Sequence, residues 1–362
     1  MKQGLKKSTP KCVPKRSYSV AVVATMSAGK STLLNAMIGH RLLPARNEAC
    51  TATVCRVEDI DSYVAFQGRV KVNGNWTTWQ TPIGYAEVQT WNDSKVDEIE
   101  LRGNLPWIDN TSDDYRVVLI DTPGPNNSTN LDHAAITENI LNSCDFAALI
   151  FVINAETPGT ADEWSFLNKI SEVIKMKRGK AQIVFALNKI DKVDPEKEET
   201  IVGILRNRIK QMSSIGFVKP IMVPVFGDLA VRIRETMYSK KKYKLKKNGV
   251  HPKNHKHGHL YEAIGTRRSL MALKTDIENV LKAKSFYRDA MKVTPEVGRV
   301  LMKYDHRRLT KAEKHDMILV DDKFFKLSEI KAAEKLSGVP ILELLLERRL
   351  NEFAKAKGQS HD

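Results

Sequence analysis

The chain has 362 residues, of which 42% are hydrophobic and 28% are charged, and its formal net charge is +15. This length and composition are those of a globular protein with a sizeable core, organised as one large domain or two smaller ones. The longest apolar runs have the length of a strand, well short of the roughly 18 residues of a membrane-spanning helix, so any membrane contact would be peripheral.

The excess positive charge is concentrated in two short segments. Residues 1–17 carry six basic residues and no acidic one, and residues 239–259 carry eight lysines and no acidic residue. The rest of the chain is therefore almost neutral, which assigns any polyanion-binding role to a tail and a loop. We predict that 239–259 is an exposed, mobile loop that contacts an anionic membrane or nucleic acid. A solvated linker without a ligand is the alternative.

The four cysteines are scattered and form no C-x-x-C pair, and no signal peptide precedes them. This usage is typical of a protein in a reducing compartment. We therefore predict a cytoplasmic protein, with membrane association limited to peripheral contact.

Strand-like and helix-like segments alternate along the first two thirds of the chain. Residues 17–24 predict a buried strand, followed by a turn of small residues and a helix over 30–39. The Asn-Gly pair inside 70–80 predicts a hairpin. Further strands are predicted at 116–120, 147–153, 182–187 and 220–225, and further helices at 131–141, 161–175 and 197–211. This alternation favours an α/β fold with a doubly wound, mostly parallel sheet flanked by helices.

Beyond about residue 238 the sequence is first rich in lysine and histidine and then helical and charged. The last helix begins near Pro340 and carries an apolar stripe that we expect to pack on the sheet domain. We predict a basic tail at 1–17, an α/β domain at 18–238, a Lys/His-rich loop at 239–259, and a helical extension at 260–362 that packs on the α/β domain.

The segment ATMSAGKST at 24–32 lies between a predicted strand and a predicted helix. Backbone N–H groups at such a turn point at phosphate, Lys30 brings a cation to the β and γ oxygens, and the Ser31 hydroxyl suits magnesium. Ala24 replaces the usual first glycine of this loop, which is tolerated if its φ is negative. The predicted phosphate-binding residues are Met26, Ala28, Gly29, Lys30, Ser31 and Thr32.

The segment DTPG at 121–124 follows a second apolar strand. A carboxylate at a strand end, Asp121, can hold magnesium through water, and the N–H of Gly124 can meet the γ-phosphate. This segment is predicted to be the switch that senses the third phosphate.

The segment NKID at 188–191 ends a third apolar strand. Guanine presents an N1–H and an amine side by side, and the Asp191 carboxylate can accept from both, whereas adenine offers no such pair. Asn188, Lys189 and Asp191 are therefore predicted to bind the base. Gly227, after the next strand, presents backbone to it. Three motifs in this order predict a P-loop NTPase that binds guanine nucleotides.

At these motifs the chain resembles the dynamin superfamily, and specifically its bacterial branch. The resemblance spans roughly residues 18–235 and the final helix, and its motifs lie at 27–36, 42–44 and 50–52. The run DTPGPN at 121–126 and the Thr-Met pair before Ser27 are similar to the replication-fork-colocalisation dynamin-like proteins of bacteria.

The resemblance implies that Thr51 ligates magnesium and holds the attacking water, and that Ser27 helps to bind a charge-compensating monovalent cation. Eukaryotic dynamins have a glutamine where this chain has Met26, so we expect slow hydrolysis without a partner. The resemblance also implies a homodimer paired across the nucleotide. The expected catalytic residues are Ser27, Lys30, Thr51 and Gly124, and the expected Mg²⁺ ligands are Ser31, Thr51 and Asp121.

We therefore predict a dynamin-like GTPase that binds Mg-GTP and hydrolyses it to GDP and phosphate. One alternative is a GTP-gated scaffold with little hydrolysis, which Ala24 and Met26 favour. Another is an RNA- or ribosome-associated GTPase, which the basic segments favour. About 120 residues follow the guanine loop, too few for a dynamin stalk, so the chain is either a stand-alone domain or the front part of a larger protein.

Overall fold

The structure is a computed structural model. It describes residues 16–25, 27–44, 53–61, 63, 65–94, 96–108, 115–123, 146–176, 182–193, 200–239, 243–246, 249–252, 273–304, 310, 313 and 316–358. Of the predicted elements, the helix at 131–141 and the tail at 1–15 lie outside these residues.

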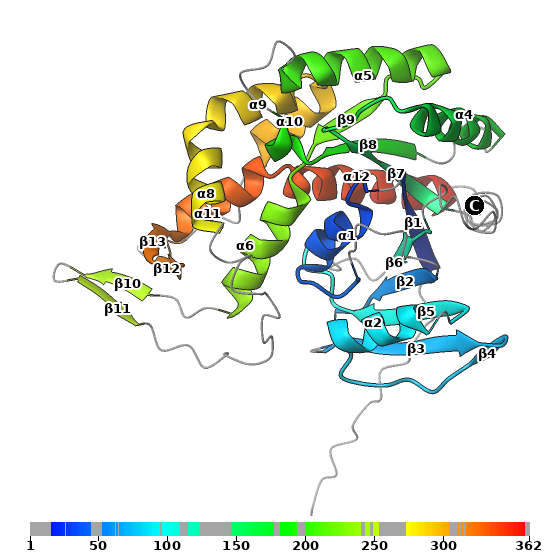
Figure 1. The fold of residues 1–362 in the computed structure, drawn as a ribbon, viewed down its shortest axis with the longest axis horizontal. Helices are drawn as coiled ribbons and strands as arrows, with labels where there is room; N and C mark the ends of the chain where they lie inside the picture. The colour runs from blue at the N-terminus through cyan, green and yellow to red at the C-terminus, as the bar shows by residue number, and fades with distance from the viewer. Residues whose placement is uncertain are drawn as a thin grey trace, which may run out of the picture.

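Within the described residues the largest element is a nine-stranded sheet, with the order β4-β3-β5-β2-β6-β1-β7-β8-β9 (Figure 1). Its strands are β1 (Arg16–Ala24), β2 (Val54–Asp59), β3 (Gln67–Val72), β4 (Asn75–Trp76), β5 (Glu98–Gly103), β6 (Tyr115–Asp121), β7 (Phe146–Asn154), β8 (Gln182–Asn188) and β9 (Ile221–Pro224). The half from β6 to β9 is parallel throughout. All nine residues of β7 are buried, as expected for a strand covered on both faces.

The other half of the sheet is mixed. Strand β2 is antiparallel to β6 but parallel to β5, and β3 is antiparallel to both β4 and β5. The hairpin predicted from the Asn-Gly pair is confirmed, because Asn73 (φ 49°) and Gly74 (φ 79°) join β3 to β4. Two consecutive residues with positive φ are typical of the tight turns that match strand twist.

Helices cover both faces of the sheet. Val20 and Val22 of β1 belong to one buried cluster with residues of α1 (Lys30–Ile38) and α12 (Val339–Gly358). Ala21 and Val23 belong to a second cluster with residues of α4 (Ala161–Met176) and α5 (Ile201–Ile215). Successive side chains of a strand point to opposite faces, so the two clusters mark two layers of helices. The predicted doubly wound α/β sheet is thus confirmed. The helices of this part are α1 (Lys30–Ile38), α2 (Tyr85–Asp93), α4 (Ala161–Met176), α5 (Ile201–Ile215) and α6 (Gly227–Ser239).

The C-terminal part is mainly helical; two of its helices lie beside β9 and its last helix runs across the middle of the sheet (Figure 1). Its last helix packs against α1 and β7, and Leu342, Leu346 and Leu350 of its apolar stripe are buried in the cluster that contains α1. The helices here are α8 (Leu273–Lys282), α9 (Lys284–Lys292), α10 (Pro295–Lys303), α11 (Leu327–Leu336) and α12 (Val339–Gly358).

The basic segment differs from the predicted loop. It contains β10 (Tyr243–Lys246) and β11 (Gly249–Pro252), which pair with β12 (Asp316–Val320) and β13 (Lys323–Lys326) in a four-stranded sheet. The reason is visible in the sequence, because YKLK at 243–246 alternates apolar and basic residues and an Asn-Gly pair follows. The extension at 260–362 likewise contains strands β12 and β13 besides its helices.

No helix within the described residues combines the length and apolar composition that crossing a membrane requires.

Candidate functional site

The predicted phosphate loop joins β1 to α1. Ala24 is the last residue of β1 and is buried, so an extended backbone accommodates its Cβ where a glycine is usual. The turn then passes through the left-handed region at Ser27 (φ 59°) and Gly29 (φ 84°). The N-cap residue of α1 is Gly29, which has no side chain to cap the helix. Its first N–H groups and the positive end of the helix dipole therefore suit an anion.

Lys30, Ser31 and Asp121 meet at the start of α1. The ammonium of Lys30 contacts Asp121 Oδ1, and the hydroxyl of Ser31 donates to Asp121 Oδ2 at 3.4 Å. All three residues are buried. Hydroxyl and carboxylate oxygens are the ligands that magnesium prefers, so these donors fit the predicted ion. Thr122, next to Asp121, anchors this strand end by donating its hydroxyl to Val22 O at 2.8 Å.

Asn188 connects the phosphate loop to the turn after β9. Its Nδ2 donates to Ala28 O at 2.9 Å, and its Oδ1 accepts from Gly227 N at 3.2 Å. A Cβ at Gly29 would lie 2.4 Å from Asn188 Nδ2, so this close approach requires glycine. The predicted residues Ala28, Gly29, Asn188 and Gly227 are thus brought together by one buried amide.

The turn that carries Gly227 is supported by the last two helices. Phe226 N donates to Ser337 O at 2.7 Å. Gly338 has a φ of 76°, and a Cβ there would lie 1.9 Å from Pro224 O. The α11–α12 junction therefore lies directly against the turn after β9, the predicted guanine loop.

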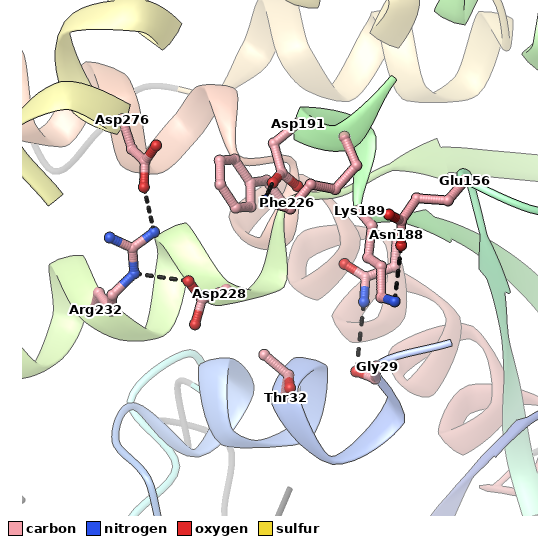
Figure 2. A pocket seen from close by; sticks show the side chains of 11 residues that line it. Gly29, Thr32, Glu156, Asn188, Lys189, Asp191, Phe226, Asp228, Arg232 and Asp276 are labelled. Atoms are coloured by element: carbon pink, nitrogen blue, oxygen red, sulfur yellow. Dashed lines mark hydrogen bonds and ion pairs between the residues drawn. The ribbon is translucent and has the colours of Figure 1, made fainter. Parts of the chain in front are cut away.

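A cavity of about 430 Å³ opens beside these residues (Figure 2). Its lining includes the predicted residues Gly29, Thr32, Asn188, Lys189 and Asp191. Lys189 has a left-handed backbone (φ 62°), and its ammonium pairs with Glu156 at 3.0 Å. A helix N-terminus at one end and a carboxylate at the other suit a ligand with phosphates and a donor-rich base.

The side chain of Asp191 is 15% exposed. Burial raises the pKa of its carboxyl, and the charge of Lys192, whose ammonium lies 3.4 Å from Asp191 Oδ2, opposes that rise. A poorly hydrated carboxylate has lost hydrogen bonds to water that the N–H groups of a bound base can replace.

Several cavity residues escaped the sequence analysis. Glu156, Phe226, Asp228, Arg232 and Asp276 also line the cavity. Two of them could have been predicted as an ion pair, because Asp228 and Arg232 are four residues apart and so share one face of a helix. No sequence pattern pointed to Asp276, which reaches the cavity through the packing of α8 on α6. The predicted residues Met26, Thr51 and Gly124 lie outside the described residues.

A phosphate loop between strand and helix, an aspartate at the end of the neighbouring strand, and an Asn-Lys-x-Asp turn beside a cavity define the class of protein. It is a P-loop domain of the guanine-nucleotide-binding type. The sequence model of the Dynamin family matches residues 20–202. The chain therefore belongs to the dynamin family and carries its GTPase domain, which confirms the resemblance seen in the motifs.

Two bacterial relatives match about half of the chain. An uncharacterized protein in the xynA 3' region of Caldicellulosiruptor sp. (strain Rt8B.4) is 26% identical over 213 residues, which cover 56% of this chain and 48% of the relative. The bacterial dynamin-like protein of Nostoc punctiforme (strain ATCC 29133 / PCC 73102) is 25% identical over 214 residues, which cover 54% of this chain and 28% of the relative. The matches thus span about half or less of the relatives' length.

Two solved structures share parts of the fold. A structure described as an oligomerised bacterial dynamin pair for the long-range sensing and tethering of membranes has 16% identity and a TM-score of 0.46, covering 79% of this chain and 45% of that chain. The G domain of the T. maritima FeoB iron transporter has 15% identity and a TM-score of 0.29, covering 59% of this chain and 89% of that one.

Proposed function

We propose that this chain binds GTP together with Mg²⁺ and hydrolyses it to GDP and phosphate. The observation that carries the proposal is the Asn188 amide, which joins the phosphate loop to the guanine-loop turn at the edge of a cavity that Asp191 also lines. The residues predicted to bind phosphate and base thereby lie close together, which supports the proposal. Membership of the dynamin family supports the same function.

Lys30 and the N–H groups that open α1 bind the β and γ oxygens and orient the phosphate chain for in-line attack. Ser31, Asp121 and Thr51 would hold magnesium, which supplies charge neutralisation on the transferring phosphoryl group. Thr51 holds the attacking water, and Ser27 helps to bind a monovalent cation that compensates charge, both by analogy with the family. Asp191 selects guanine because its two oxygens face two donors.

Competition binding tests the base specificity. GTP and GDP should displace a fluorescent guanine nucleotide from the wild-type protein, whereas ATP at the same concentration should not. Equal displacement by ATP would refute guanine recognition. Single-turnover hydrolysis, measured at low and high protein concentration, then separates a GTPase from a GTP-gated scaffold with little hydrolysis.

Thr51→Ala should lower the turnover of GTP by on the order of a hundredfold, the scale at which a positioned catalytic group acts, with a much smaller loss of GTP affinity. The reason is that its hydroxyl acts on magnesium and water when the switch closes over the γ-phosphate. Phosphate release and nucleotide titration measure the two quantities.

The matched control for that experiment is Thr53→Ala. Thr53 donates its hydroxyl to Val96 O at 2.9 Å, at the start of β2, and should leave turnover nearly unchanged. An unchanged rate in Thr51→Ala would transfer the water-holding role to another residue, with Ser27 the next candidate.

The family resemblance leads us to propose also that two copies of the domain pair across the nucleotide. The molecular mass in solution should double when GDP is replaced by GDP with aluminium fluoride, which mimics the transition state. A monomer in both conditions would refute nucleotide-dependent pairing.

The basic segment 239–259 is proposed to contact a polyanion. Basic residues gain roughly 1 kcal/mol each at an anionic membrane, and on nucleic acid they gain affinity from counterion release. Sedimentation with anionic liposomes and gel shift with RNA and duplex DNA, at low and at physiological salt, should reveal binding. Replacing lysines 240, 241, 242, 244, 246 and 247 with glutamine should abolish it.

The control for the polyanion experiment is the second basic segment. Replacing Lys2, Lys6, Lys7, Lys11 and Lys15 with glutamine removes similar charge and should retain most of the binding. If the wild type binds neither polyanion at low salt, the segment is a linker. Preference for RNA over liposomes would support a nucleic-acid-associated GTPase.

A further inference from the structure

One wall of the guanine cavity comes from outside the P-loop domain. Asp276, in the first turn of α8, lines the same cavity as Asn188 and Asp191. Helix α8 packs against α6, the helix that begins at Gly227. The C-terminal extension therefore contributes Asp276 to the cavity, on the side away from Gly29 of the phosphate loop (Figure 2).

Arg232 of α6 joins the two helices. Its Nε donates to Asp228 Oδ2 at 2.7 Å and its Nη2 donates to Asp276 Oδ2 at 2.5 Å (Figure 2). The Arg232 side chain is only 5% exposed, whereas Asp228 and Asp276 are 50% and 28% exposed. Burial alone would lower the pKa of Arg232, but the two carboxylates outweigh burial and raise it. The guanidinium therefore stays charged and fixed between them.

We propose that Arg232 is a positioning residue for guanine recognition: it holds α8 as a wall of the cavity and compensates the charge of Asp276, which acts on Asp191. The inference rests on the proposed function, because it concerns the cavity assigned to the base. It adds a role for the C-terminal extension in nucleotide binding.

The electrostatic part follows from the groups around Asp191. Lys192, in the same turn, lowers the pKa of Asp191, whereas Asp276 from α8 raises it. Tyr287 of α9 also lies within the field of Asp191 and Asp276 and stays neutral, because burial first and these charges second raise its pKa to about 12. Lys189 at the cavity is paired with Glu156.

The affinity for guanine nucleotides should depend on the ionisation of Asp191. Guanine donates two N–H groups to the ionised carboxylate, so affinity is complete above the pKa of Asp191 and falls as the pH drops through it. Removing Arg232 leaves Asp276 and Asp228 uncompensated, which raises the pKa of Asp191 further and moves the loss of affinity to higher pH. Removing the charge of Asp276 lowers the pKa of Asp191 and moves the loss to lower pH.

The test measures GDP affinity by calorimetry from pH 8 downward in the full-length protein and in three variants, Arg232→Gln, Asp276→Asn and Lys274→Gln. Lys274→Gln is the matched control, because Lys274 lies on α8 and donates to Asp322 at 2.7 Å outside the cavity lining. Titration of the phosphates of GDP is common to all four proteins and cancels when the acid midpoints are compared.

At neutral pH, Arg232→Gln should weaken GDP binding by about tenfold, the scale of one charge-assisted hydrogen bond. Asp276→Asn should weaken it less, because the amide oxygen still accepts from Arg232, and Lys274→Gln should match the wild type. The acid midpoint should rise in Arg232→Gln and fall in Asp276→Asn. Opposite shifts are the signature of an electrostatic role, since loss of structure alone would move both variants in the same direction.

Wild-type protein that binds neither GDP nor GTP would overturn the proposed function, and this inference with it. Wild-type binding together with unchanged affinity and midpoint in Arg232→Gln would overturn the inference alone. Acid midpoints that shift in the same direction in Arg232→Gln and Asp276→Asn, or that do not shift in either, would also overturn the inference. Should Arg232→Gln fail to fold, the direction of the midpoint in Asp276→Asn decides the question.

Discussion

Replacing Lys30 with alanine should lower the affinity for GTP by on the order of a thousandfold, because two charge-assisted contacts with the β and γ oxygens are lost together. Lys30 is a buried cation at the start of α1, where it pairs with Asp121. Calorimetry with GTP measures the loss. Undiminished affinity in a well-folded variant would refute the assignment of the phosphate loop.

Stability must be separated from binding in this variant. Lys30 pairs with the buried Asp121, and removing one partner of a buried pair costs on the order of 3 kcal/mol of unfolding free energy. The double variant Lys30→Ala/Asp121→Asn removes the unpaired charge, so it should recover much of the thermal stability, while its affinity for GTP should stay well below that of Asp121→Asn, which removes the proposed magnesium ligand alone. If affinity recovers with stability, Lys30 acts on the fold and not on the nucleotide.

The parallel half of the sheet could be predicted because each functional motif in it directly follows an apolar run of strand length, so the same segments indicate both the strands and the site. The Ala24, Asp121 and Asn188 positions each follow an apolar run, and the carboxyl ends of parallel strands meet at one edge of a sheet. This geometry is why three separated motifs could be assigned to one site. The contact of Asn188 with both Ala28 and Gly227 could not be read from spacing, since it depends on how the turns approach.

The mixed half of the sheet and the C-terminal extension were harder to predict from the sequence. Strand β2 pairs antiparallel with β6 and parallel with β5, a choice set by the connections between them and not by the alternation of their side chains. The hairpin β10–β11 could have been predicted from the alternating YKLK segment and the Asn-Gly pair after it, but the many lysines favoured the prediction of an exposed loop. Asp276 follows Arg232 by 44 residues, and only the packing of α8 on α6 brings the two together.

Replacing Asp191 with asparagine should exchange the base specificity of the site. In the proposed site the two carboxylate oxygens accept from the N1–H and the amine of guanine, and an asparagine would place an N–H₂ donor against that amine. Xanthine carries a carbonyl oxygen in place of the amine and keeps its N1–H, so it matches the new donor and acceptor. Affinity for GTP should fall by on the order of a hundredfold, and xanthosine triphosphate should bind better than GTP.

The control for the specificity exchange is Glu156→Gln. Glu156 lines the same cavity and pairs with Lys189, and in Figure 2 it lies beside Lys189 and apart from Asp191. Its loss should leave the preference for GTP over xanthosine triphosphate intact. Competition between the two nucleotides, measured at a pH above the raised pKa of Asp191, gives the ratio directly. An unchanged ratio in Asp191→Asn would mean that another residue reads the guanine edge, and the cavity assignment would have to be revised.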